Sequence, residues 1–137
     1  MWVLYALLSA LFAALTSILA KVGMANIDSN LATAIRTVVI LVLSWGIVFF
    51  TGKHQEIPTL SQRNLLFLVL SGIATGLSWL CYFRALQIGE AVKVIPIDKF
   101  SAVIGMTLAV MVLKEALTVK SIIGGALITI GTIVLIL

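Results

Sequence analysis

Two ionisable side chains, Asp98 and Lys99, lie within an apolar stretch of the sequence, directly after Pro96. A charge at membrane depth costs upwards of about 2.5 kcal/mol, so its presence there indicates function by default. Proline removes a backbone N–H and bends or interrupts a helix, and charges beside an interrupted helix are typical of transporter sites. We therefore expect these three residues in a substrate or ion pathway. A structural ion pair of Asp98 with Arg36 or Arg84 is the alternative.

Three other basic residues lie in or near apolar stretches, and each has two interpretations. Arg36 lies about 9 Å inside its expected helix by helical rise, where either a pathway role or snorkelling to the headgroups fits. Lys21 and Arg84 lie nearer to helix ends, which favours snorkelling over a pathway role. Because Asp98 is the sole acid within the expected spans, this excess of positive charge favours anionic or zwitterionic substrates over lipophilic cations. Asp98 is the first candidate for carrying a coupling proton, and Lys99 is the second.

Two aromatic residues near the end of the third apolar stretch are further candidates. Trp79 and Tyr82 are residue types that gather at the membrane interface, which is their ordinary interpretation. Trp79 follows Gly76 at helical spacing, so it is also a candidate to line a cavity on the same helix face.

The elements that must position these residues are five long apolar segments. The chain of 137 residues is 62% hydrophobic and only 10% charged, with a mean hydropathy of +1.25. A soluble domain usually carries about 25% charged residues, and a membrane span needs about 20 apolar residues. We expect an all-α integral membrane protein with one five-helix domain over residues 1–137. Its expected spans cover about residues 2–21, 31–51, 62–86, 91–113 and 118–137.

Small residues at intervals of three or four positions mark the helix faces expected to pack closely. In lipid, helices associate through small residues and polar contacts rather than through the hydrophobic effect. Glycines are prominent on these faces, and we expect them in helix packing or a dimer contact: Gly72, Gly76, Gly105, Gly124, Gly125 and Gly131.

Several function classes lack the residues that they require. The nine Lys and Arg are scattered singly, so the basic patch of a nucleic-acid-binding protein is missing. His54, the sole histidine, lies in a polar loop without a neighbouring nucleophile or metal-ligand cluster. There is no Gly-rich phosphate loop. We expect no enzyme, no cofactor and no metal.

Lysine and arginine counts on the two membrane sides indicate orientation only weakly. The side holding the connections after the second and fourth spans has four basic residues, against three on the other side before Arg36 and Lys99 are assigned. The first group is Lys53, Arg63, Lys114 and Lys120; the second is Lys21, Arg84 and Lys93. A cytoplasmic N-terminus in a bacterial inner (plasma) membrane is favoured, and this near balance is also compatible with insertion in both orientations.

The second half of the chain resembles a known family. The stretches YFRALQIGEAVKVIPIDK (82–99), LKEALT (113–118) and IGGALITIG (123–131) are similar to the EamA-type domain of the drug/metabolite transporter superfamily. Glu115, Gly124, Gly125 and Gly131 match positions of the family pattern. The resemblance extends over essentially the whole chain and implies a secondary transporter, namely an exporter of a small metabolite, amino acid or drug-like solute.

Many relatives carry two such domains with opposite orientations in one chain, whereas this sequence holds one. The resemblance therefore implies a homodimer, most simply an antiparallel one; a parallel dimer or a related partner chain stays open. Besides the lipid bilayer, the expected partners are a small-molecule substrate and this second copy. The alternative function is that of a structural or accessory membrane subunit that does not transport, and a lipid-modifying enzyme ranks third for want of catalytic residues.

Overall fold

The computed structural model describes residues 1–137, which form helices and connecting loops without a strand. The helices are α1 (Trp2–Gly23), α2 (Ser29–Phe50), the 3-10 helix η1 (Lys53–Thr59), α3 (Gln62–Ile88), α4 (Ala91–Asp98), α5 (Ser101–Leu113) and α6 (Val119–Ile136). Five helical segments are long and apolar enough to cross a membrane, and α4 and α5 together make the fourth of them. The expected fold class, an all-α membrane protein with five spanning helices, is confirmed.

Contacts along the chain divide it into two compact units. The first unit combines Met1–Ile18 with Ile88–Leu137, and the second comprises Leu19–Gln87. The first division falls within α1 and the second at the end of α3.

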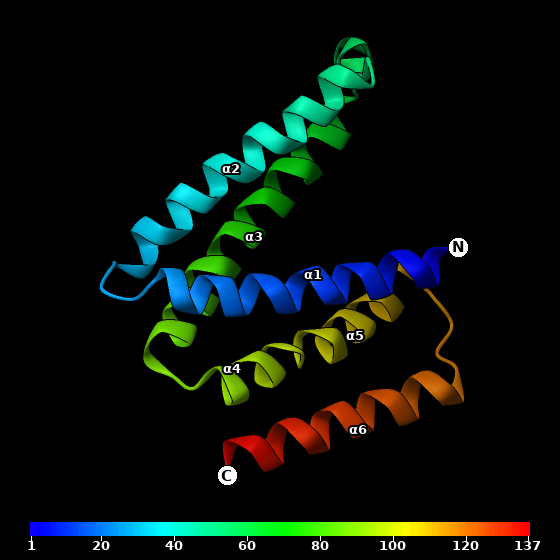
Figure 1. Ribbon diagram of the computed structural model, residues 1–137. Helices are drawn as coiled ribbons and strands as arrows, with labels where there is room; N and C mark the ends of the chain where they lie inside the picture. The colour runs from blue at the N-terminus through cyan, green and yellow to red at the C-terminus, as the bar shows by residue number, and fades with distance from the viewer. The chain divides into compact units, whose positions relative to one another are not determined.

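In the unit Leu19–Gln87, α2 and α3 form a long hairpin with η1 at its tip (Figure 1). Asp28 starts α2, because its Oδ1 atom accepts hydrogen bonds from the backbone N–H groups of Asn30 (2.9 Å) and Leu31 (3.2 Å). Such a cap satisfies donors that have no partner inside the helix. Gly52 follows α2 in the left-handed region at φ 72°, a conformation that glycine adopts without steric cost.

The buried side chains of this unit gather at one junction, where the end of α1, the start of α2 and the end of α3 meet. Leu86, Ser29 and Phe83 are almost fully buried, with 0%, 1% and 2% exposure. The remaining buried members are Ala20, Met24, Ala32 and Thr33. The hairpin is therefore anchored at the end where α3 finishes, and its other end carries the polar η1 turn.

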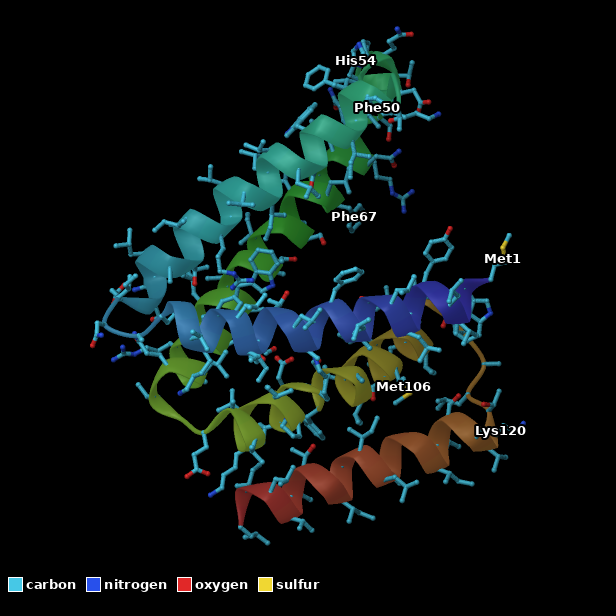
Figure 2. The ribbon with its side chains drawn as sticks, viewed as in Figure 1. Met1, Phe50, His54, Phe67, Met106 and Lys120 are labelled. Atoms are coloured by element: carbon cyan, nitrogen blue, oxygen red, sulfur yellow. The ribbon has the colours of Figure 1, made fainter.

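In the other unit, α6 runs back alongside α4 and α5 (Figure 1). Gly125 on α6 is buried, and a Cβ atom added there would lie 3.2 Å from the Cε atom of Met106. Figure 2 shows Met106 on α5, on the side of α6. Gly125 therefore lies where α6 packs against α5 within this unit.

The other glycines expected to pack have open space around them. A Cβ atom added at any of them would meet no side chain or neighbouring backbone within 4 Å: Gly72, Gly76, Gly105, Gly124 and Gly131. Their role in a contact with a second chain stays a prediction.

Helices α4 and α5 are separated by a turn at Lys99 and Phe100. The break thus falls three residues after Pro96, which itself lies inside α4. The backbone N–H of Lys99 donates to the Pro96 carbonyl and that of Phe100 to the Ile97 carbonyl, both at 3.0 Å. These bonds span three residues instead of four, which tightens the chain and ends the regular helix. The fourth span is therefore interrupted beside Asp98 and Lys99.

Most large apolar side chains point outward from both units. Exposed fractions reach 79% at Trp2, 95% at Phe50 and 72% at Met111. In water such faces would aggregate, whereas in a bilayer they contact acyl chains. The exposed apolar surface thus accounts for the high hydrophobic content of the sequence.

Candidate functional site

An open groove separates α2 from α3 and has a cavity volume of about 750 Å³. Its polar lining comes from both helices and consists of Asn30, Thr33, Thr37, Ser71 and Thr75. Gly72, Gly76 and Trp79 also line it. Because glycine has no side chain, the two glycines on α3 leave the space that this groove occupies.

The hydroxyl groups of the groove are oriented by their own helices. Thr33 donates to the Ser29 carbonyl (2.7 Å), Thr37 to the Thr33 carbonyl (2.8 Å) and Thr75 to the Ser71 carbonyl (2.9 Å). A hydroxyl has one hydrogen to donate and lone pairs that accept. These three side chains therefore offer hydrogen-bond acceptors to anything that enters the groove.

Arg36 directly precedes Thr37, a lining residue of this groove, but does not itself line it. Its guanidinium carbon lies 4.0 Å from the ring centroid of Phe83 on α3, a cation–π contact. One guanidinium nitrogen, NH1, is buried and has no hydrogen-bond partner. Arg36 is thus held against α3 by an aromatic ring while part of its donor capacity is unused.

Lys21 and Arg84 lie at the buried junction. The Lys21 ammonium donates to the backbone carbonyls of Leu86 and, at 3.3 Å, Gln87. Arg84 donates to the Gln87 side-chain oxygen at 3.0 Å, and the Gln87 side-chain nitrogen donates to the Ile27 carbonyl at 2.6 Å. A cation at the last carbonyls of a helix also interacts favourably with the helix dipole. These contacts give Lys21 and Arg84 a positioning role at the end of α3.

Asp98 and Lys99 form an ion pair with each other, at 3.2 Å. The side chain of Asp98 is 32% exposed and that of Lys99 is 57% exposed. Within its own unit Asp98 thus has Lys99 as a partner, and the alternative pairing of Asp98 with Arg36 or Arg84 stays a prediction. The pair lies at the break between α4 and α5.

The candidate residues divide between the two units. The unit Leu19–Gln87 holds Lys21, Arg36, Gly72, Gly76, Trp79, Tyr82 and Arg84. The other unit holds Pro96, Asp98, Lys99, Gly105, Gly124, Gly125 and Gly131. Trp79 is among the residues that line the groove, whereas the Tyr82 ring packs edge-on against Phe83 with centroids 5.1 Å apart.

A second, smaller cavity of about 290 Å³ lies between α5 and α6. Met106, Thr107, Ser121 and Thr129 are among the residues that line it. Its lining holds no charged residue, and its position over Gly125 makes it part of the helix packing described above.

The sequence interpretation missed the groove hydroxyls and Gln87. A repeat of Thr33 and Thr37 on one helix, facing Ser71 and Thr75 on the next, is the signal that could have identified the groove. Residues four apart lie on one helix face, so each pair forms a polar stripe. Gln87 had no such signal, because its role depends on where the loop carbonyl of Ile27 lies in space.

Comparison with known proteins identifies the family of this chain. The chain matches the EamA-like transporter family over residues 1–137. It is 50% identical over 134 residues to a Sinorhizobium sp. protein named an uncharacterized transporter in the cobO 3' region, covering 98% of this chain and 95% of that protein. An uncharacterized protein of Methanocaldococcus jannaschii is 32% identical over 83 residues, 61% of each chain. No solved structure matches. With its five membrane-spanning helices, the chain belongs to the EamA-like transporter family of membrane proteins.

Proposed function

We propose that this chain is a secondary transporter that exports a small metabolite, amino acid or drug-like solute. The groove between α2 and α3 is the observation that carries the proposal. Its volume of about 750 Å³ lies within the range of about 300–1,000 Å³ that small-molecule pockets occupy. It combines hydroxyl groups with an aromatic ring in a largely apolar lining, as small-molecule pockets commonly do.

We also propose that two copies complete the pathway, in an antiparallel homodimer in the bacterial inner membrane. The groove is open, so a second surface is needed to enclose a solute. Open space around Gly72 and Gly76 permits a helix of another chain to approach closely there. The near balance of basic residues between the two sides supports insertion in both orientations. The Sinorhizobium relative, whose length this chain nearly covers, carries the name of a transporter.

The fourth span, which is interrupted between α4 and α5, is proposed to move during transport. The turn at Lys99 and Phe100 lacks regular helical hydrogen bonds, and broken helices accompany transport sites in other membrane proteins. Asp98 is then the proposed proton carrier for coupling, because it is the one acid inside the five apolar segments.

An efflux assay with loaded proteoliposomes tests transport and coupling together. Efflux of a labelled amino acid panel is expected to depend on an imposed pH gradient, and Asp98→Asn is expected to remove that dependence. Glu90→Gln is the matched control, because Glu90 is exposed and pairs with Lys93 at 3.8 Å outside the break. Pathway function at Asp98 is contradicted if Asp98→Asn and Glu90→Gln leave the gradient dependence equally intact.

An accessory subunit without transport is the second candidate, and one observation favours it. Asp98 and Lys99 form an ion pair with each other at 3.2 Å, as a purely structural pair would.

Tags on both termini, probed from each side of the membrane in cells, test whether the two copies are antiparallel. Both termini are expected on both sides; one fixed orientation would contradict the antiparallel arrangement, and absence of flux for the whole panel would favour the accessory role.

A further inference from the structure

We infer that the groove between α2 and α3 binds a solute that carries a carboxylate, and that Arg36 binds this carboxylate. The inference names a substrate class for the proposed transporter and rests on the proposed function for the solute's route. Binding itself is measurable without transport or a second copy.

Arg36 has no acidic partner in its unit. The two carboxylates between Leu19 and Gln87 are those of Asp28 and Glu56. Asp28 accepts hydrogen bonds from the backbone at the start of α2, and Glu56 pairs with Lys53 in η1. The Arg36 NH1 atom is buried without a hydrogen-bond partner. A charge inside a membrane span is costly, so an anion paired with the Arg36 guanidinium would lower that cost.

The contact with Phe83 fixes how an anion can approach. The guanidinium carbon lies over the Phe83 ring, 4.0 Å from its centroid, and the N–H groups of a guanidinium point outward in its own plane. A carboxylate binds that edge with two parallel hydrogen bonds. Phe83 is 2% exposed and belongs to α3, so this contact holds Arg36 of α2 against α3.

The edge of Arg36 lies beside the groove lining. By helical periodicity Arg36 is about 60° round α2 from Thr33, and it directly precedes Thr37; both threonines line the groove. On α3, Phe83 follows Trp79 by four residues and shares its face, and Trp79 also lines the groove. An anion bound at Arg36 therefore extends into the groove past the Trp79 ring.

The remaining lining defines the rest of the solute. Because Thr33, Thr37 and Thr75 spend their hydroxyl hydrogens on backbone carbonyls, they accept hydrogen bonds and suit a solute with a hydroxyl or ammonium group. No acid lines the groove, so a lipophilic cation finds no counter-charge. The lining fits a carboxylate with a neighbouring donor group and an apolar remainder.

Trp79 provides the readout. In a full-length chain carrying Trp2→Phe and Trp45→Phe, Trp79 is the sole tryptophan, and nitroaromatic probes quench tryptophan on contact. Para-nitrobenzoate, the neutral para-nitrobenzamide and the cationic para-nitrobenzylamine share size and chromophore and differ in charge. Saturable quenching by the benzoate is expected at a Kd at least about tenfold below those of the other two, as for a charge-assisted pair. Equal quenching by all three probes overturns the inference.

Substitutions assign the effect to Arg36. Arg36→Gln is expected to abolish the preference for the benzoate, and Arg36→Lys to retain part of it, since a point charge replaces a bidentate donor. Arg63→Gln is the matched control: Arg63 also lies over a ring, Phe67, at 6.0 Å, but neither of its chain neighbours lines the groove, whereas Arg36 directly precedes the lining residue Thr37. An unchanged preference in Arg36→Gln overturns the assignment. If Arg36→Gln fails to insert, titration of the three probes against the protein with Arg36 and against Arg36→Lys decides whether Arg36 causes the preference.

A lipid phosphate offers Arg36 the same anionic oxygens, so the measurement is repeated in two bilayers. Nanodiscs of phosphatidylcholine alone and nanodiscs with added phosphatidylglycerol are expected to give the same benzoate affinity. Loss of the preference with phosphatidylglycerol assigns Arg36 to headgroups and overturns the solute site. Flux of an uncharged solute without benzoate binding would contradict this inference while supporting transport. Benzoate binding without flux supports it and contradicts the proposed function.

Discussion

Two basic residues inside apolar helices are accommodated by different contacts. Lys21 donates to the last carbonyls of α3, so its charge stabilises a helix end. Arg36 lies over the Phe83 ring, and the two carboxylates of its unit are engaged elsewhere, so its charge has no acidic partner within that unit. The sequence left both residues between a structural and a pathway role, because the difference lies in partners more than 40 residues away.

Replacing Lys21 with methionine tests the structural role. Met keeps the apolar length of the side chain but leaves the Leu86 carbonyl without this charged donor, so we expect a loss of about 1–3 kcal/mol in unfolding free energy. Lys53→Met is the control, because Lys53 pairs only with Glu56 in an exposed loop. Denaturation in mixed micelles, followed by circular dichroism, measures both. Equal stability of the two variants would contradict the capping role.

At the scale of elements, the interrupted span is the clearest feature. Pro96 predicted an interruption, and the structure places it at Lys99 and Phe100, three residues later. A proline deprives the preceding turn of one hydrogen bond, yet the helix continues through it and ends where three-residue hydrogen bonds begin.

Pro96→Ala restores the N–H that the Val92 carbonyl lacks. We expect a more regular α4 and a gain of roughly 1–3 kcal/mol in unfolding free energy, accompanied by slower flux if the break moves during transport. Pro58→Ala, in η1 outside the spans, is the control. Faster flux, or a loss of stability in Pro96→Ala, would count against a functional break.

The packing of α5 against α6 depends on Gly125. A leucine there would meet Met106, whose Cε atom already lies 3.2 Å from an added Cβ, so we expect Gly125→Leu to destabilise the protein by about 1–3 kcal/mol. Met106→Ala removes the obstructing atoms and is expected to restore part of the loss. A double-mutant cycle in mixed micelles measures the coupling. Purely additive effects would show that the two residues do not share this contact.

The sequence predicted the spans and the family because hydropathy and small-residue spacing are local patterns. It also indicated Trp79 through the spacing from Gly76. It did not predict the α2–α3 groove, since Thr33 and Thr37 are also common in helices that merely pack. Nor did it predict that Asp98 would pair with Lys99, because ion pairs depend on side-chain direction at an irregular turn.

At the scale of the whole molecule, the unit Leu19–Gln87 presents an open groove with a row of hydroxyl groups, and several glycines of both units have open space around them. Polar groups at membrane depth need protein or water around them. A second copy over the groove would provide both an enclosure and a water-accessible path, which is the central claim of the proposed mechanism.

Cysteine accessibility along α2 tests this claim most directly. In a Cys81→Ser background, which removes the sole natural thiol, Thr37→Cys faces the groove, whereas Val39→Cys lies outside its lining and is 61% exposed as the parent residue. Only a hydrated thiol ionises and reacts with a membrane-impermeant thiol reagent. Rapid labelling of Thr37→Cys in native membranes, with Val39→Cys unreactive, is the predicted result. Labelling of neither thiol, or of both equally, would contradict a water-filled pathway between α2 and α3.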